Sequence, residues 1–326
     1  MTDIAASTNR ARIDIGRIAR ALAPLIALAA ILAGVGTLNP NFLTLMSLQN
    51  LAADSAVLLI LATGQTLVIL TGRIDLSICA LASFSSILVA LWHDRLGWSG
   101  VALAVVVIGA IGAIQGAIQG FAQIQSFVVT IGGLFLWSGV GLIVSQAKAV
   151  PVSYAHNVVA VLGGDETTFG VPDSMILALV ILAVIAAALR WLPAGRKLFA
   201  LGVSERAAIL SGLRVNRLVI GVFTISALCS AVAGIVLVAD FSAGRPGLAD
   251  ALLLPTIAAV AVGGTSITGG IGGLARTLIG VMIVALLRVG INVVGAPPQY
   301  QQIVYGVIVI LAVTLTIDRS KLTVVK

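Results

Sequence analysis

The sequence predicts an all-α membrane protein, a polytopic bundle of about ten transmembrane helices with one short helix in a loop outside the membrane. Apolar residues make up 60% of the 326 residues and charged residues only 10%, whereas soluble domains are roughly 45–50% apolar and 25% charged. Apolar runs of about twenty residues, long enough to cross about 30 Å of hydrocarbon, recur along the chain. Basic residues gather in alternate loops between these runs.

The first predicted span follows a basic N-terminal stretch. This stretch resembles the start of a signal peptide, but no small-residue cleavage site follows it, so we interpret residues 1–20 as a retained cytoplasmic tail. Residues 21–318 form the transmembrane domain, which includes a polar loop at 192–217, and residues 319–326 form a second cytoplasmic tail. The predicted spans are 21–38, 51–71, 74–92, 100–121, 127–145, 174–191, 217–239, 254–272, 274–294 and 300–317.

The distribution of Lys and Arg predicts the orientation. Cytoplasmic loops are enriched in both residues. With ten spans and the N-terminus in the cytoplasm, the inner face receives both terminal basic clusters and the cluster at 190–217, while the outer face receives only Arg95, Lys148 and Arg245. The net charge of +7 is therefore interpreted as a mark of topology and not of nucleic-acid binding.

Two predicted spans are irregular. Only the letters TGR separate span 74–92 from its predecessor, and span 254–272 contains GGTSITGGIGG. Each interior Gly costs a helix about 0.8–1 kcal/mol relative to Ala. Either span is therefore an ordinary helix with a tight turn or a broken or re-entrant element, and short Gly-interrupted segments point to the substrate path in transporters.

The stretch GAIQGAIQG places Gly112, Gly116 and Gly120 four residues apart. They share one helix face and allow a neighbouring backbone to approach closely. We expect this face to serve helix packing, with Gln115 and Gln119 placed to form hydrogen bonds across the contact.

The polar loop contains a short predicted helix. Ser204 is a good N-cap, Glu205 lies in the first turn where the helix dipole favours an anion, and Gly212 suits the left-handed position after the helix. A helix of about two turns is marginal alone in water, so it must pack on something. It either lies on its own membrane domain, with its arginines near lipid headgroups, or docks into a cytoplasmic partner.

Motifs for energy conversion or catalysis do not occur in the sequence. It contains no G-x-x-x-x-G-K-[ST] phosphate loop, no His-rich metal motif and no G-x-S-x-G elbow. Cys79 and Cys229 lie far apart in apolar runs, without Cys or His neighbours at ligand spacing. The sequence therefore predicts a protein that is not an enzyme and binds no cofactor itself.

Ionisable residues are rare in the predicted spans. Asp54 and Asp75 lie near span ends, and Asp75 is placed to cap the helix that follows it. Arg288 is the one basic residue well inside a span, where we expect it to snorkel, to pair across helices or to face a pathway. Ion-coupled transport usually needs intramembrane carboxylates or histidines, so this pattern favours a neutral solute.

Several segments together resemble the membrane subunit of ribose-type ATP-binding-cassette importers. They include the letters TGRIDLS, QSFVVTIGGL, GVSERAAILSG and IAAVAVGGTSITGGIGG. The resemblance covers nearly the whole chain in order. The matching segments are Asn41–Ser77, Gln119–Leu134, Gly195–Val215, Ile257–Gly273 and Thr277–Val313.

The resemblance implies a permease of the cell inner membrane, paired with a second copy of itself. It also implies a cytoplasmic ATPase subunit, which holds ATP and Mg²⁺, and a periplasmic sugar-binding protein. The short helix matches the family's coupling helix, which contacts the ATPase. The residues expected in that contact are Gly202, Ser204, Glu205, Arg206, Ala207, Ala208, Leu210 and Gly212.

Some residues depart from the family pattern. Arg73 and Cys79 stand where glycines are common, Ser126 replaces a proline, and LLLPT replaces an acidic residue before IAAV. We therefore expect a monosaccharide or similar polyol as substrate, with a branched-chain amino-acid importer permease and an ion-coupled secondary transporter as alternatives. The expected pathway residues are Gln65, Thr71, Asp75, Ser77, Thr265, Ser266 and Asn292.

Overall fold

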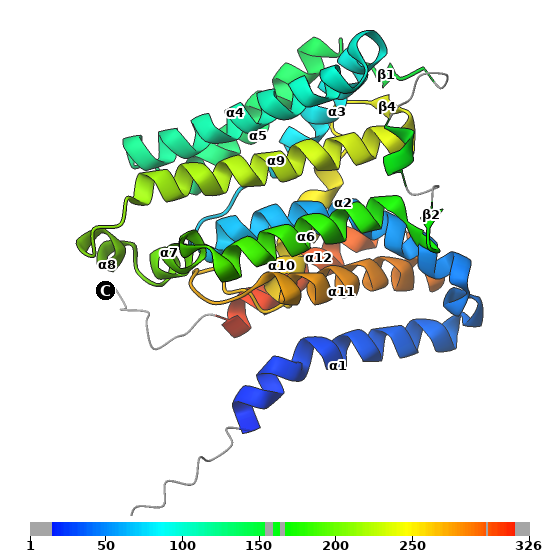
Figure 1. Ribbon diagram of the computed structural model, residues 1–326. Helices are drawn as coiled ribbons and strands as arrows, with labels where there is room; N and C mark the ends of the chain where they lie inside the picture. The colour runs from blue at the N-terminus through cyan, green and yellow to red at the C-terminus, as the bar shows by residue number, and fades with distance from the viewer. Residues whose placement is uncertain (1–14, 154–158, 164–166, 298, 317–326) are drawn as a thin grey trace, which may run out of the picture.

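A computed structural model of the chain describes residues 15–153, 159–163, 167–297 and 299–316. Long helices lie roughly side by side and make one bundle (Figure 1). The helices are α1 (Ile15–Leu38), η1 (Pro40–Leu43), α2 (Leu45–Leu70), α3 (Ile78–Leu96), α4 (Trp98–Ala122), α5 (Ser126–Val144), η3 (Ala160–Leu162), α6 (Asp173–Trp191), α7 (Pro193–Val203), α8 (Glu205–Leu210), α9 (Val215–Phe241), η4 (Asp250–Leu252), α10 (Leu253–Val262), α11 (Leu274–Val293) and α12 (Gln299–Thr316).

Two antiparallel strand pairs lie at one end of the bundle. Strand β1 (Val150–Pro151) pairs with β4 (Ala243–Gly244), with Val150 opposite Gly244, and β2 (Thr167–Thr168) pairs with β3 (Val171–Pro172). We call this the hairpin end. The short helices α7 and α8 lie at the opposite end, which we call the α8 end (Figure 1).

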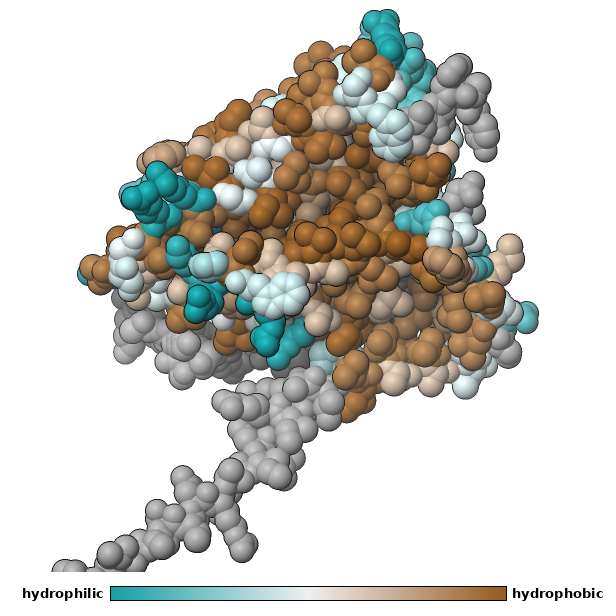
Figure 2. Space-filling model, in the orientation of Figure 1, coloured by the Kyte–Doolittle hydropathy of each residue, from teal (hydrophilic) through white to brown (hydrophobic). Residues whose placement is uncertain are grey.

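The helices confirm an all-α protein with membrane-spanning segments. Six of them, α2, α4, α5, α6, α9 and α11, are long and apolar enough to cross a membrane. Figure 2 shows apolar residues across the middle of one face and hydrophilic residues gathered toward its ends. The other helices at predicted span positions, α1, α3, α10 and α12, fall outside these six, so the count of ten spans stays a prediction.

The two irregular spans differ from regular helices. Residues 72–77 are not helical, so α3 begins at Ile78 and not near residue 74. In the predicted span 254–272, α10 ends at Val262 and an irregular segment at 263–273 follows. A positive φ angle at Gly264 follows the end of the helix, and positive φ angles at Gly269 and Gly270 keep the rest of the segment irregular. The predicted span 254–272 is therefore an interrupted helix and not a continuous one.

The predicted tails differ in how far the structure describes them. The helix α1 begins at Ile15, inside the segment 1–20 that the sequence predicts as a tail, and residues 1–14 lie outside the described residues. The predicted tail 319–326 also lies outside them.

Helix α2 occupies the centre of the bundle. Every residue from Ser55 to Leu70 is buried, and α6, α9, α10 and α11 pack around it. A helix that is apolar on all sides is buried on all sides. The position of α2 therefore follows from its composition.

The predicted glycine face of α4 packs on α9, as expected. A Cβ at Gly112 would meet the Cβ of Ala227 and would lie 2.6 Å from the carbonyl oxygen of Phe223. Gln115 accepts a hydrogen bond from Ser77 Oγ at 3.1 Å, which links α4 to the start of α3 and not to α9. The Gln119 amide has no hydrogen-bond partner within the described residues.

Three backbone segments meet at the α8 end without side chains between them. The Gly270 N–H donates to the Leu70 carbonyl at 3.0 Å. A Cβ at Gly202 would collide with that same carbonyl, and a Cβ at Gly269 would lie 2.6 Å from the Gly72 nitrogen. This glycine junction joins the end of α2, the end of α7 and the segment at 263–273.

We predict that Gly112→Val destabilises the protein, because the side chain would force α4 away from α9. Overpacking of this kind costs about 1–3 kcal/mol, which a lower thermal unfolding midpoint in detergent would register. The control is Gly139→Val on α5, where a Cβ meets nothing within 4 Å. Equal midpoints for the two variants would contradict the close contact.

Candidate functional site

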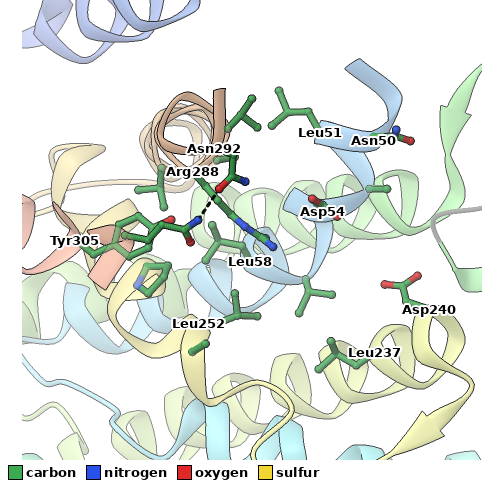
Figure 3. Close-up of a pocket in the computed structure, with 18 of the residues that line it drawn as sticks. Asn50, Leu51, Asp54, Leu58, Leu237, Asp240, Leu252, Arg288, Asn292 and Tyr305 are labelled. Carbon is green, nitrogen blue, oxygen red and sulfur yellow. Dashed lines mark hydrogen bonds between the residues drawn. The ribbon is translucent and has the colours of Figure 1, made fainter. Parts of the chain in front are cut away.

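A cavity of about 510 Å³ lies at the hairpin end, between α2, α9, α10, α11 and α12 (Figure 3). This volume is within the range of small-molecule sites, roughly 300–1,000 Å³. Its apolar wall comes mainly from the deeper turns of the helices. That wall includes Leu51, Val57, Leu58, Leu237, Leu252, Pro255, Val284 and Ala285.

Polar side chains reach the cavity from two helices with the same spacing. On α2, Asn50 and Asp54 are four residues apart, and on α11, Arg288 and Asn292 are four residues apart. Residues at this spacing lie on one face of a helix. Because α2 and α11 pack against each other, these two faces converge on the same space.

A hydrogen bond joins the α11 and α12 sides of the cavity. Gln301 Nε2 donates to Asn292 Oδ1 at 3.1 Å, and Tyr305 lies one turn further along α12, with 5% of its surface exposed. Asn292 and Gln301 therefore present two neighbouring amide groups, whose donors and acceptors suit recognition of hydroxyl groups.

Charged groups of both signs line the cavity. Asp54 and Asp240 contribute carboxylates from α2 and α9, and Arg288 contributes a guanidinium. Figure 3 shows Arg288 extending from α11 toward the side where Asp54 lies. Within the described part of the chain, Arg288 forms no hydrogen bond or ion pair. The guanidinium carries five N–H donors.

Three of the predicted pathway residues form a buried cluster near the α8 end. Asp75 accepts hydrogen bonds from the Ser77 N–H at 2.9 Å, Ser77 Oγ at 2.6 Å and Ser226 Oγ at 3.1 Å. With its amide oriented to match its neighbours, Gln65 donates to the Asp75 carbonyl at 3.1 Å and accepts from the Asp75 N–H at 3.3 Å. Asp75 thus ties α2, α9 and the start of α3 together.

The other predicted pathway residues lie elsewhere. Thr71 donates to the Val68 carbonyl at 2.6 Å at the end of α2. Thr265 and Ser266 belong to the segment 263–273, where Thr265 Oγ1 accepts from the Gly273 N–H at 3.4 Å. Only Asn292 of the predicted set lines the 510 Å³ cavity. A substrate contact by any of these residues stays a prediction.

The predicted coupling segment has the local geometry that its sequence favours. Ser204 Oγ accepts from the Ala207 N–H at 3.3 Å at the start of α8, and Gly212 has a φ of 77° after its end. Ala208 is buried, while Ile209 and Leu210 are 56% and 81% exposed. The helix is thus anchored on one side and presents apolar side chains on the other.

An ion pair links α8 to the segment that follows α2. Arg73 Nη2 lies 2.9 Å from both carboxylate oxygens of Glu205. The two residues border a second cavity of about 980 Å³, which is also lined by the end of α4 and the starts of α5 and α9. The described residues contain no group of three or more His, Cys, Asp or Glu side chains that could hold a metal ion.

The sequence matches a known transporter family over residues 47–313, described as "Branched-chain amino acid transport system / permease component". This match covers most of the chain. The chain belongs to this family. It is a transport permease, and its long apolar helices indicate a multi-pass membrane protein.

Curated relatives of this permease cover it almost end to end. It is 36% identical to the ribose import permease protein RbsC of Escherichia coli strain K12, over 91% of this chain and 93% of the relative. It is 38% identical to the probable ABC transporter permease protein YphD of that strain, over 90% and 88%. It is 31% identical to the D-allose transport system permease protein AlsC of the same strain, over 88% and 89%. No solved structure matches the permease.

Sequence reasoning missed part of the cavity of this permease. Asn50, Asp240, Gln301 and Tyr305 were not predicted, although all of them line it. A signal was present for Asn50, because a polar residue four positions before Asp54 places two polar groups on one face of an otherwise apolar helix. No comparable local signal marks Asp240, which meets the others only through helix packing.

Proposed function

We propose that this permease is the membrane subunit of an ATP-binding-cassette importer that carries a neutral monosaccharide or similar polyol. The single observation that carries this proposal is the 36% identity to a ribose import permease over nearly the whole of both chains. The cavity at the hairpin end supports it, because amides, carboxylates and a guanidinium suit hydroxyl groups. ATP and Mg²⁺ are held by a separate ATPase subunit, and this chain binds no cofactor.

The proposed topology has ten spans, α1 to α6 and α9 to α12, in the inner membrane with both termini in the cytoplasm. The charge of the two ends supports this orientation, since cytoplasmic loops are enriched in Lys and Arg. The α8 end contains Arg73, Arg190, Arg196, Lys197, Arg206, Arg214, Arg217 and Arg276, whereas the hairpin end contains Arg95, Lys148, Arg245 and, in its cavity, Arg288.

The 510 Å³ cavity then faces the periplasm. A periplasmic binding protein delivers the solute to it, so the permease needs only weak binding of its own. Asn292 and Gln301 hold hydroxyl groups at the mouth of this path. The remaining predicted pathway residues, Gln65, Thr71, Asp75, Ser77, Thr265 and Ser266, lie closer to the cytoplasmic gate in this arrangement.

The α8 helix is proposed as the coupling helix. Its exposed apolar side chains, Ile209 and Leu210, insert into the cytoplasmic ATPase subunit, while Ala208 holds the helix to the permease. Two copies of the permease supply two such helices, and closure of the ATPase pair on ATP moves them together. Alternating access of the cavity follows from that movement.

The proposed function is tested by reconstituting the permease in vesicles with its ATPase subunit and sugar-loaded binding protein. We expect ATP-dependent uptake of the monosaccharide and none by the permease alone under a proton or sodium gradient. Uptake by the permease alone would favour an ion-coupled transporter. A binding protein that holds leucine or a similar amino acid would favour the amino-acid alternative, for which Arg288 and Asp54 provide charges of both signs.

Asn292→Ala should lower the ATP-dependent uptake rate by between about twofold and tenfold, because one hydrogen bond to the solute is lost. The measurement is initial uptake of labelled sugar at saturating binding protein. Asn41→Ala provides the control, since Asn41 is exposed and does not line the cavity. Equal rates for the two variants would exclude Asn292 from the path.

Leu210→Glu should weaken association with the ATPase subunit by about tenfold or more, since a charge would enter an apolar contact. A titration of labelled ATPase subunit against the permease in detergent measures this. The matched variant Leu96→Glu changes a half-exposed leucine at the hairpin end and should bind as the unchanged permease does. Unaltered binding by Leu210→Glu would argue against docking through α8.

A further inference from the structure

The pair formed by Arg73 and Glu205 joins two parts of the chain that are 132 residues apart. Arg73 belongs to the non-helical segment 72–77 between α2 and α3, and Glu205 opens α8. One guanidinium nitrogen serves both carboxylate oxygens at 2.9 Å. It is the one ion pair between Arg or Lys and an acid in the described residues.

The two partners differ in how firmly they are held. The Arg73 side chain is 15% exposed, and its Nη1 donates to the Thr71 carbonyl at 3.4 Å. The Glu205 side chain is 49% exposed on a helix of only six residues. The guanidinium therefore forms the fixed side of the pair, and the carboxylate moves with α8.

The segment 72–77 connects this pair to the interior of the permease. Two residues after Arg73, the Asp75 carboxylate accepts hydrogen bonds from Ser77, at the start of α3, and from Ser226 on α9. Gln65 on α2 contacts the Asp75 backbone. Arg73 is thus two residues away from Asp75, whose hydrogen bonds reach three central helices, α2, α3 and α9.

We propose that Arg73 is a positioning residue that transmits the movement of α8 to the segment 72–77 through Glu205. The inference rests on the proposed function, because α8 moves only if an ATPase subunit acts on it. The inference goes beyond that function, because it names the residues through which the movement of α8 reaches the interior of the permease. The glycine junction also lies at the α8 end, but its backbone contacts join α7, and not α8, to the end of α2.

The exposure of Glu205, about half of whose side chain is accessible, indicates a role in coupling more than in stability. Solvent-exposed ion pairs contribute little to folding because water screens them and both side chains lose freedom. An ion pair also keeps its attraction while its partners shift by a fraction of an ångström, since Coulomb energy falls slowly with distance. Such a contact suits a joint between a moving helix and a fixed segment.

The test is a double-mutant cycle in the complete transporter, with permease, ATPase subunit and binding protein in vesicles. The variants are Arg73→Gln, Glu205→Gln and the two combined. The readout is the ATPase rate stimulated by loaded binding protein, divided by the unstimulated rate. We expect each single variant to lower this ratio by about fivefold, within the range of allosteric coupling. The double variant should lower it no further than either single variant.

Arg217→Gln is the matched control, because Arg217 lines the same cavity and forms no ion pair with another described residue. Its stimulation ratio should equal that of the unchanged permease. Arg73→Gln, which lies outside the expected ATPase contact, should bind the ATPase subunit normally, and each variant should keep its thermal unfolding midpoint within about 3 °C. These two measurements separate a coupling role from a merely structural one.

Three results would overturn the inference. The first is a normal stimulation ratio for Arg73→Gln, and the second is an effect of Arg73→Gln that is as large in the Glu205→Gln background as it is with Glu205 intact. The third is a loss of stimulation by Arg73→Gln that accompanies an equal loss of ATPase binding or of thermal stability. Absence of stimulation in the unchanged complex would instead refute the proposed function itself, and this inference with it.

Discussion

The burial of α2 on all sides forces its polar groups to find partners within the protein, and these partners organise the centre of the bundle. Thr63 and Thr66 donate to carbonyls one turn earlier in α2, at 2.7 and 2.6 Å. Thr66 also lies 2.7 Å from Thr277 on α11, hydroxyl to hydroxyl. Further along, Gln65 meets the Asp75 backbone. Unsatisfied polar groups are costly in an apolar interior, so the contacts of Thr66 with Thr277 and of Gln65 with Asp75 help to fix how the neighbouring segments sit around α2.

Both functional regions are attached to this one helix. The first turns of α2 supply Asn50 and Asp54 to the cavity at the hairpin end, and the segment after its last turn supplies Arg73 and Asp75 at the α8 end. A rigid, fully packed helix between them keeps the two regions in register. In the proposed function, solute handling and coupling are therefore arranged along a single axis, and helices such as α5 and α6, which are far less buried, lie outside it.

Local sequence predicted the local features well. The Ser204 cap, the Gly212 turn and the glycine face of α4 are each set by residues within one or two turns, and the structure has all three. The cavity could be predicted only in part, because five helices converge on it and the sequence of a single helix does not determine how the five pack together. The partner of Arg73 lies 132 residues away, so the sequence marked that position only as a departure from a family pattern.

The glycine junction has a consequence for how this sequence changes over evolutionary time. The backbones near Leu70, Gly202 and Gly270 touch directly, so a single methyl group on Gly202 would push two other segments away, and one on Gly270 would push away the end of α7. Substitutions of these glycines are not neutral, because any larger residue is tolerated only after the neighbouring segments have shifted. The residues of the glycine junction therefore have to change together. In duplicated copies of the gene, these positions should be the last to diverge.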